Sequence, residues 1–140
     1  MARRAPPLTD TDFARLLGFR DGLRRFLHWS EAEAKRVGLT GPQHQLLLAI
    51  RGHGGPPSIG DISTHLLLKH HSTVELVDRA ERAGLIERRA DTDDHRVVRL
   101  FLTRSGSAKL SALADTHIEE LARLRPHLEP LWTRLPATNS

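Results

Sequence analysis

A β-hairpin is predicted for residues 85–102, which read LIERRADTDDHRVVRLFL. Val98, Leu100 and Leu102 recur at every second position, the period at which side chains of a strand share one face. Residues 85–89 supply the first strand, and the acidic segment 90–95 lies between the two. We therefore expect two short strands joined by a polar tip.

Helical periodicity precedes the hairpin. Apolar residues recur every three or four positions from Phe13 to Gly38, and a second helix follows Thr40 until the Gly- and Pro-rich segment 52–57. Ser58-Ile-Gly-Asp61 has the spacing of a capping box, in which a hydroxyl and a carboxylate satisfy the free N–H groups of a helix start. It opens a short helix that extends through Leu66.

A fourth helix is predicted over residues 73–83. The sequence does not determine where this helix begins. Ser72 and Glu75 form a second capping pair, but Lys69 or His70 could equally be the cap. Residues 68–72 are therefore expected to form a turn between two short helices.

A long helical region follows the hairpin, with Thr103 as its cap. Seven of eight positions that step by four and three are Leu or Ala, which favours packing against another helix. These positions are 110, 114, 117, 121, 124, 128, 131 and 135. Pro126 is expected to end one helix and to start another, because proline is tolerated in a first turn and not in the interior.

The order of these elements predicts a winged helix-turn-helix, a mainly α fold with a small β-hairpin wing. An α-helix fits the major groove of DNA, and a narrow hairpin tip can reach the adjacent minor groove. The sequence therefore indicates a protein that binds double-stranded DNA.

Two segments resemble the MarR family of transcriptional regulators. Residues 91–106, DTDDHRVVRLFLTRSG, are similar to that family's wing, and residues 73–88 are similar to its recognition helix and the exit from it. The resemblance covers residues 39–106 and implies a DNA-binding lobe there, with residues 11–38 and 107–140 forming a helical dimerisation region after a flexible tail over 1–10. It also implies a homodimer that binds a pseudo-palindromic operator, and a ligand pocket where the dimerisation helices meet the lobe.

The candidate DNA-binding residues come from the fourth helix and the wing. The helix places His71, Ser72 and Glu75 on its outward face near its start, where side chains reach base edges. Glu75 could accept from cytosine or complete a cap for Ser72. The full set is His70, His71, Ser72, Thr73, Glu75, Arg79, Arg82, Asp94, His95 and Arg96.

Arginines of this set have distinct expected roles. Arg79 and Arg82 could contact phosphates or form solvated ion pairs with acidic residues at helical spacing. Arg96 can enter a narrow minor groove, with Asp94 holding its guanidinium. The resembled family often has Asp-Arg-Arg here, so His95 makes one charge of the wing pH-dependent.

Composition narrows the function further. The 140 residues carry a net charge of only +4, so the case for DNA rests on where the arginines lie. The absence of cysteine excludes disulfides, thiol redox sensing and iron–sulfur clusters.

We expect no cofactor, because no nucleophile–base pair or phosphate loop is present, and no metal, because the nine histidines lack metal-ligand spacing. The start of the chain lacks the apolar stretch of a signal peptide, and no apolar run is long enough to span a membrane, so we expect a cytoplasmic protein.

The leading hypothesis is a homodimeric regulator of transcription, acting as a repressor. A phenolic or aromatic carboxylate effector is expected to release it, and the candidate residues for the pocket are His28, Trp29, Gln43 and His44. Two alternatives remain: a constitutive DNA-binding protein without an effector, and a winged-helix module that binds an acidic protein. No enzymatic function is expected.

Overall fold

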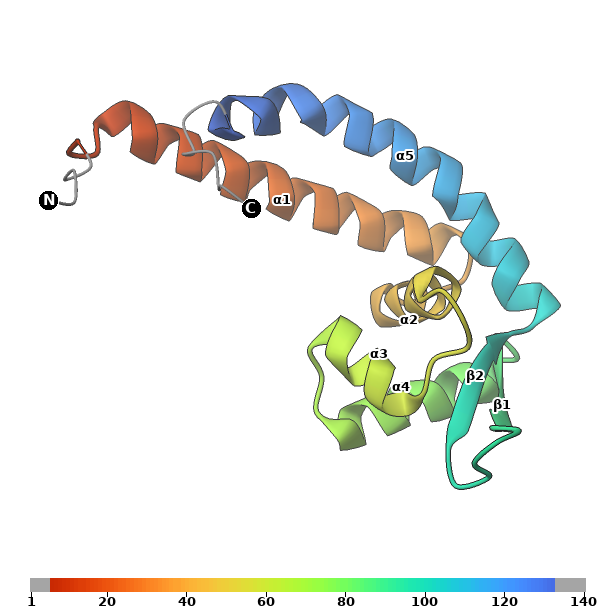
Figure 1. Cartoon of the computed structure of the whole chain (residues 1–140). Helices are drawn as coiled ribbons and strands as arrows, with labels where there is room; N and C mark the ends of the chain where they lie inside the picture. Colours follow the sequence, from red (N-terminus) through yellow and green to blue (C-terminus); the bar gives the residue numbers. More distant parts are fainter. Residues whose placement is uncertain (1–5, 133–140) are drawn as a thin grey trace, which may run out of the picture. The chain divides into compact units, whose positions relative to one another are not determined.

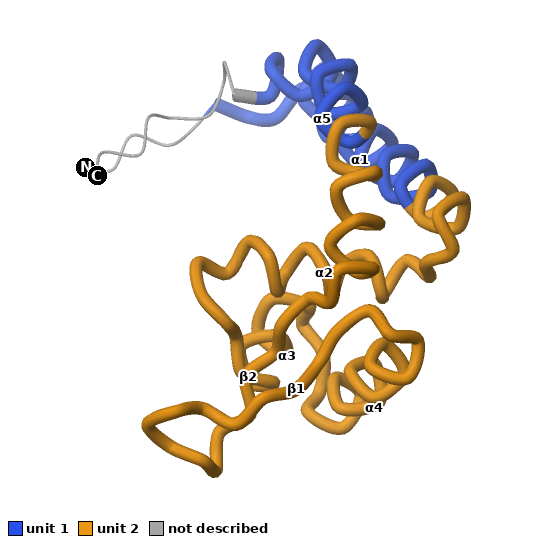
Figure 2. The backbone as a smooth tube through the Cα atoms, turned by 90° about the vertical axis from the view of Figure 1, so that its right-hand side faces the viewer, with its two compact units in different colours: residues 1–30, 117–140 blue, residues 31–116 orange. Residues whose placement is uncertain are grey.

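A computed structural model of the chain describes residues 6–132. Its elements follow in the order α1 (Asp10–Arg36), α2 (Gly41–Gly52), α3 (Ile59–Leu66), α4 (His70–Arg82), β1 (Ile86–Ala90), β2 (Val98–Leu102) and α5 (Arg104–Trp132) (Figure 1). The predicted class, mainly α with a two-stranded wing, is confirmed. The chain divides into two compact units, one of residues 1–30 and 117–140 and one of residues 31–116 (Figure 2).

The unit of residues 31–116, called the lobe below, is built around one apolar core. Leu46 and Leu47 of α2, Ile62 of α3, Val77 of α4 and Leu100 of β2 are fully buried in it. Ala34 at the end of α1 and Leu110 and Leu113 near the start of α5 join the same core. The lobe is therefore wider than the predicted range 39–106, because both flanking helices contribute a turn or two to its core.

The wing is an antiparallel hairpin in which Ile86 pairs with Leu102 and Ala90 with Val98. An isolated bridge between Ser58 and Arg99 ties β2 to the segment before α3, and the amide of Leu100 donates to the carbonyl of Pro57 at 2.9 Å. The base of the wing is thus fixed to the helices by backbone hydrogen bonds.

Two helix starts in the lobe have the capping boxes that their sequences favour. The Thr40 hydroxyl accepts from the amide of Gln43, whose side chain accepts from the Thr40 amide, both at 3.1 Å. Ser58 and Asp61 make the equivalent pair at 3.1 and 2.9 Å, which confirms the predicted cap of α3. Such caps satisfy amides that would otherwise lack a partner.

The start of α4 settles an alternative that the sequence leaves open. Lys69 is the N-cap and makes no side-chain capping bond, and the helix begins at His70. Ser72 and Glu75 lie inside the helix, so they do not form a capping pair. The Glu75 side chain is exposed and carries no capping role.

The other unit consists of α1 up to residue 30 and α5 from residue 117. The Ser30 hydroxyl lies 2.7 Å from Nε2 of His117, whose ring is 4.8 Å from that of Trp29 and meets Phe26 edge-on. His117 is therefore a hydrogen-bonded histidine between α1 and α5. An added Cβ on Gly22 would lie 3.7 Å from Leu124, which shows how closely the two helices pack here.

Two predictions about the ends of the chain differ from the structure. α5 is continuous through Pro126 and Pro130, so the expectation that Pro126 separates two helices is wrong. Each proline removes one helix hydrogen bond, but the helix continues because the residues around the prolines favour helix. α1 begins at Asp10, inside the predicted tail, because Thr9 caps it through Asp12. Residues 1–5 of that tail and position 135 of the helical repeat lie outside the described residues.

Candidate nucleic-acid interface

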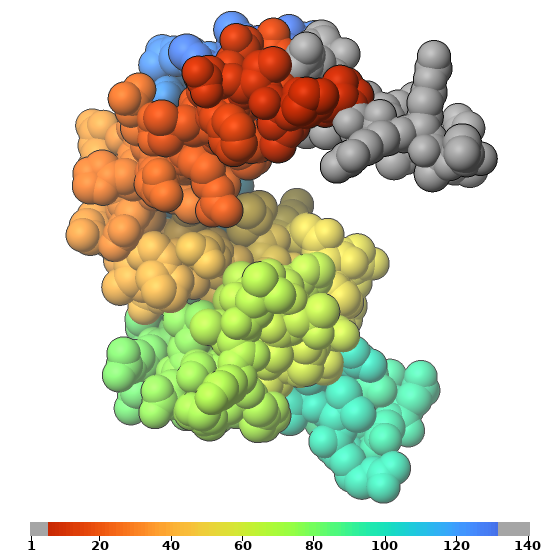
Figure 3. All heavy atoms as spheres, turned by 90° about the vertical axis from the view of Figure 1, so that its left-hand side faces the viewer, coloured from red at the N-terminus to blue at the C-terminus, as the bar shows by residue number. Residues whose placement is uncertain are grey.

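α4 presents a polar face away from the core. His70, His71, Glu75, Arg79 and Arg82 are exposed on it, and Ser72 is half-buried. Figure 3 shows the hairpin (turquoise) projecting beyond the surface that α3 and α4 form (green). An exposed helix face beside a projecting hairpin is the arrangement that major- and minor-groove contacts require.

Thr73 differs from the other candidates of α4, because it is fully buried. Its hydroxyl donates to the Lys69 carbonyl at 3.1 Å and accepts from the Ser63 hydroxyl at 2.8 Å. The side chain therefore joins α3 to α4 inside the lobe and is not available at the surface.

Arg88 of β1 determines which charges of α4 remain available. Its Nη1 lies 2.8 Å from Oε1 of Glu81, its backbone amide donates to Oε2 of the same residue at 3.2 Å, and its Nη2 lies 2.5 Å from Oδ1 of Asp78. None of the ion pairs within residues 6–132 involves Arg79 or Arg82. The ion-pair alternative for these two arginines is therefore not observed, and their charge is available for phosphates.

The wing tip is organised around Asp94. Its Oδ1 accepts from the amide of Arg96 at 3.1 Å and from Nε at 3.0 Å, and its Oδ2 accepts from Nη2 at 3.2 Å. The hydrogen bonds from Arg96 lower the pKa of the Asp94 carboxyl. The Arg96 side chain is 90% exposed, so it is held in direction while it remains open to solvent. This is the role that the sequence predicts for Asp94. The neighbouring His95 is exposed as well.

A series of polar contacts that the sequence did not predict connects the wing to the end of α2. Arg99 lies 3.6 Å from Asp91 and 3.9 Å from Oδ2 of Asp61. The same oxygen is 3.4 Å from Nε2 of His53, whose Nδ1 is 2.9 Å from Nε2 of His65. The backbone amide of Ser58 has the largest effect on the pKa of Asp61 and lowers it, against the effect of burial, and the Ser58 hydroxyl, His53 and Arg99 lower it further. These contacts connect the tip of the wing to α3.

The predicted effector residues lie in different units. His28 is exposed on α1, and Trp29 is half-buried beside His117. In the lobe, His44 is buried at 8% exposure, and the side-chain oxygen of Gln43 is engaged in the cap of α2. Trp29, Gln43 and His44 thus each have local contacts, and the pocket itself remains a prediction.

Residues 6–132 contain no group of three or more His, Asp or Glu side chains arranged to hold a metal ion. In the same part of the chain, no helix is both long and apolar enough to cross a membrane.

Comparison with protein families and curated proteins identifies relatives of the lobe. The model of the MarR family matches residues 37–97. An uncharacterized HTH-type transcriptional regulator of Bacillus subtilis (strain 168), YkoM, is 32% identical over 76 residues, which are 54% of this chain and 49% of YkoM. The chain therefore spans about half the length of this curated relative.

Solved structures share the fold over most of the chain. A MarR family transcription regulator superposes with a TM-score of 0.73 at 25% identity, covering 82% of this chain and 76% of its own. A MarR family protein from Bacillus stearothermophilus gives 0.72 at 24% identity, with 84% and 82% covered. A mutant of MepR from Staphylococcus aureus, bound to an oligodeoxyribonucleotide, gives 0.64 at 20% identity, with 94% and 87% covered.

The matched segment 37–97 contains α2, α3, α4, β1 and the wing tip, which carry the polar surface described above, and it ends just before β2. Over this segment the chain is similar to the MarR family, and it shares its fold with MarR family transcription regulators of known structure.

Proposed function

We propose that this chain is a homodimeric repressor that binds a pseudo-palindromic operator in duplex DNA. In each protomer α4 occupies the major groove and the wing the adjacent minor groove. The observation that carries the proposal is Arg96 at the wing tip, 90% exposed and held by Asp94. An arginine aimed from a narrow hairpin is suited to the strongly negative potential of a narrow minor groove.

The face of α4 supports the same binding mode. His71 and Glu75 are exposed near the start of the helix, where side chains reach base edges. Glu75 has no capping role and can accept a hydrogen bond from cytosine N4. Arg79 and Arg82 follow on the exposed side, with their charge free for phosphates, because Arg88 pairs with the nearby acids.

Exposed apolar side chains support the homodimer. Among the described residues of the unit 1–30 and 117–140, eight large apolar residues have 40% or more of their surface exposed, far more than an isolated helix pair needs to leave in water. They are Leu8, Phe13, Leu16, Leu17, Leu23, Leu27, Ile118 and Leu121. A second copy would bury them, and its two-fold symmetry would present two α4 helices to half-sites about 34–36 Å apart.

Release by an effector follows from the same geometry. A ligand that binds more tightly when the two α4 helices have a different separation lowers the affinity for the operator by linkage. Repression and release are therefore two states of one dimer.

The test is a fluorescence-anisotropy titration of a duplex that the wild-type protein has selected from a random pool. Arg96→Ala should weaken binding at least several-fold. The matched control is Arg36→Ala, which removes another exposed arginine paired with a nearby carboxylate. Equal affinities of wild type and Arg96→Ala would overturn the wing's role.

Salt dependence separates the proposal from its alternatives. The logarithm of affinity should fall linearly and steeply with the logarithm of salt concentration, because bound phosphates release counterions. Failure to select any duplex would instead favour a winged-helix module for an acidic protein. Sedimentation equilibrium measures the dimer directly, and a monomer at micromolar concentration would contradict it.

A further inference from the structure

Two histidines meet between α2 and α3, and we call them the histidine pair. His53 is the C-cap residue of α2, and His65 lies in the last turn of α3. Nδ1 of His53 is 2.9 Å from Nε2 of His65, and the rings meet edge-on with their centroids 5.2 Å apart. The two rings are thus joined by a direct hydrogen bond, although they are twelve positions apart in the sequence.

The histidine pair has charged neighbours on α3 and on the wing. Nε2 of His53 lies 3.4 Å from Oδ2 of Asp61, and Arg99 lies 3.9 Å from the same oxygen. Arg99 also lies 3.6 Å from Asp91, which follows β1. The amide of Ser58 lowers the pKa of the Asp61 carboxyl, so this group stays negative over the pH range in which histidines titrate.

Other positive and titratable groups near the pair belong to α2 and to the start of α4. Arg51 precedes His53 by two residues and forms none of the ion pairs found within residues 6–132. Residues 69–71, a lysine and two histidines, are exposed beyond the end of α3. In the described part of the chain, none of these side chains is hydrogen-bonded or ion-paired to a ring of the pair. The negative charge in contact with the pair is therefore that of Asp61.

The geometry accommodates one added proton and not two. With both rings neutral, Nε2 of His53 donates toward Asp61, and Nδ1 accepts from Nε2 of His65. With one proton added, His53 donates from both nitrogens, to Asp61 and to a neutral His65. With two protons added, both nitrogens of the 2.9 Å contact carry hydrogen, no acceptor remains, and two positive charges repel each other.

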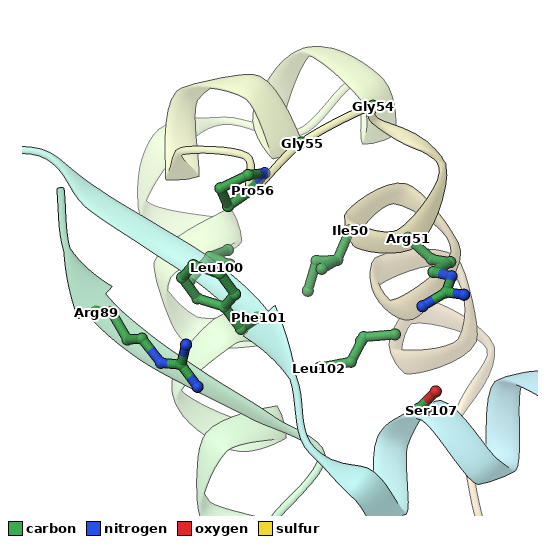
Figure 4. Close-up of a pocket in the computed structure, with 10 residues that line it drawn as sticks. All are labelled: Ile50, Arg51, Gly54, Gly55, Pro56, Arg89, Leu100, Phe101, Leu102 and Ser107. Carbon is green, nitrogen blue, oxygen red and sulfur yellow. The ribbon is translucent and has the colours of Figure 1, made fainter. Parts of the chain in front are cut away.

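The chain segment that follows His53 connects this contact to the wing. Figure 4 shows residues 54–56 passing from the end of α2 toward β2. At the end of the segment the Pro57 carbonyl accepts from the amide of Leu100, and the next residue forms a bridge with Arg99. One end of the segment is therefore held by the histidine pair, and the other end is bound to β2.

We propose that the histidine pair is a pH-sensitive contact that holds the end of α2 against α3 and, through residues 54–58, positions the base of the wing. The contact is closed when the pair carries no added proton or one, and the second proton opens it. His53 and His65 are therefore positioning residues, which act on DNA binding through the wing.

Proton linkage gives the direction of the effect on stability. The unfolded chain takes up a proton on each of the two histidines near about pH 6.5, whereas the closed pair takes up one. A state that binds fewer protons loses stability as the pH falls. The contribution of the pair is therefore complete above about pH 7.5 and declines toward about pH 5.

The first experiment compares urea unfolding of the wild-type chain and His65→Gln between pH 7.5 and pH 5. Glutamine can still donate to Nδ1 of His53, but it takes up no proton. On acidification the ratio of folded to unfolded protein should fall about tenfold more in wild type than in the variant, because one proton is excluded from the closed pair.

Two further variants complete the comparison. His53→Gln should flatten the pH profile as His65→Gln does, because either change leaves a single histidine at the contact. His127→Gln, which replaces an exposed histidine on α5, should keep the profile of wild type. Parallel pH profiles for wild type and His65→Gln would overturn the proposal.

Nuclear magnetic resonance of the histidine rings tests the contact itself. At pH 7.5 Nδ1 of His53 should carry no proton. As the pH falls, the two rings should take up protons in two separate steps, and the backbone amides of residues 53–58 and 99–100 should shift with the second step. Protonation of both rings in one step, without shifts in these two segments, would overturn the proposal.

The effect on DNA rests on the proposed function and is measured separately. Acid adds charge to the exposed His70, His71 and His95, which should strengthen binding to the selected duplex in wild type and in His65→Gln. Wild type should gain less affinity between pH 7.5 and pH 5.5 than the variant, because opening of the pair loosens the base of the wing. Equal gains would overturn the step from the pair to DNA. Failure to bind any duplex, with the expected stability profiles, would overturn the proposed function and leave the pH-sensitive contact intact.

Discussion

Arg88 on β1 binds Asp78 on α4, with Nη2 of the arginine 2.5 Å from Oδ1 of the carboxylate. The same guanidinium reaches Glu81, one turn further along the helix, at 2.8 Å. The wing and α4 are thus joined by a cation that is only 24% exposed. One residue therefore holds the wing against α4 and neutralises two acids that would otherwise lie beside Arg79 and Arg82.

Replacing Arg88 with alanine should weaken both the lobe and its affinity for DNA. The free energy of unfolding is expected to fall by about 1–2 kcal/mol, since hydrogen bonds to charged groups are lost. DNA affinity should fall as well, because the two freed carboxylates repel phosphates. Urea denaturation and anisotropy titration measure the two effects.

The control for Arg88 is Arg125→Ala, which removes an exposed pair with Glu129 on α5. Exposed pairs contribute little, so this change should cost less than about 1 kcal/mol. Adding Asp78→Asn and Glu81→Gln to Arg88→Ala should recover part of the DNA affinity. No recovery would contradict the electrostatic explanation.

Acid should remove the contribution of Asp61 to the stability of α3. The amide of Ser58 lowers the pKa of Asp61 below its ordinary value of 3.8 in the folded protein. Because the folded pKa is the lower one, the stabilisation is present above about pH 4 and disappears as the pH falls through the folded pKa. Wild type should therefore lose its advantage over Asp61→Asn in strong acid.

Denaturant unfolding between pH 6 and pH 2.5 tests this expectation for Asp61. The stability difference between wild type and Asp61→Asn should shrink on acidification. Asp115→Asn, which changes an exposed carboxylate on α5, provides the control. A difference that stays constant over the whole range would show that the carboxylate charge is not what stabilises the cap.

Local features of the fold and the site could be predicted because they involve neighbours in sequence. The capping box at Ser58 spans three residues, and the hydrogen bonds between Asp94 and Arg96 span two. The alternation of apolar residues predicted the strand of the wing, and helical periodicity predicted which face of α4 points outward. Each of these signals depends on the local backbone alone.

Contacts between distant residues could not be predicted in this way. Arg88 and Asp78 are ten residues apart, and His53 and His65 are twelve apart. Their meeting depends on how α2, α3, α4 and the wing pack, which no spacing rule provides. Pro126 is a case in which a local rule gave the wrong prediction. Proline is disfavoured inside a helix, yet α5 continues through this residue.

Leu67 should be replaceable by glycine with a gain in stability. It ends α3 in the left-handed conformation, with φ of 54° and ψ of 42°, and is 91% exposed. A side chain in this conformation costs about 1–2 kcal/mol, whereas glycine adopts it freely at a smaller entropic cost. Leu67→Gly should raise the urea midpoint modestly, and Leu67→Val should lower it. A lower midpoint for Leu67→Gly would mean that the leucine makes stabilising contacts.

Gly106 should tolerate no side chain. A Cβ at this position would lie 2.1 Å from the carbonyl oxygen of Leu85, which is backbone and cannot rotate away. That carbonyl also accepts from the amide of Thr103 at 3.0 Å, so moving it would disturb the junction between the wing and α5. Gly106→Ala should therefore lower the free energy of unfolding by at least about 2 kcal/mol.

The matched control for Gly106 is Gly52→Ala at the end of α2, where an added Cβ meets nothing within 4 Å. The same chemical change there should be neutral or stabilising by up to about 1 kcal/mol, because alanine restricts the unfolded chain. Thermal and urea unfolding of both variants isolate the steric term from the change in backbone entropy. If the two variants were equally stable, the close approach of Gly106 to Leu85 could not be what requires glycine after the wing.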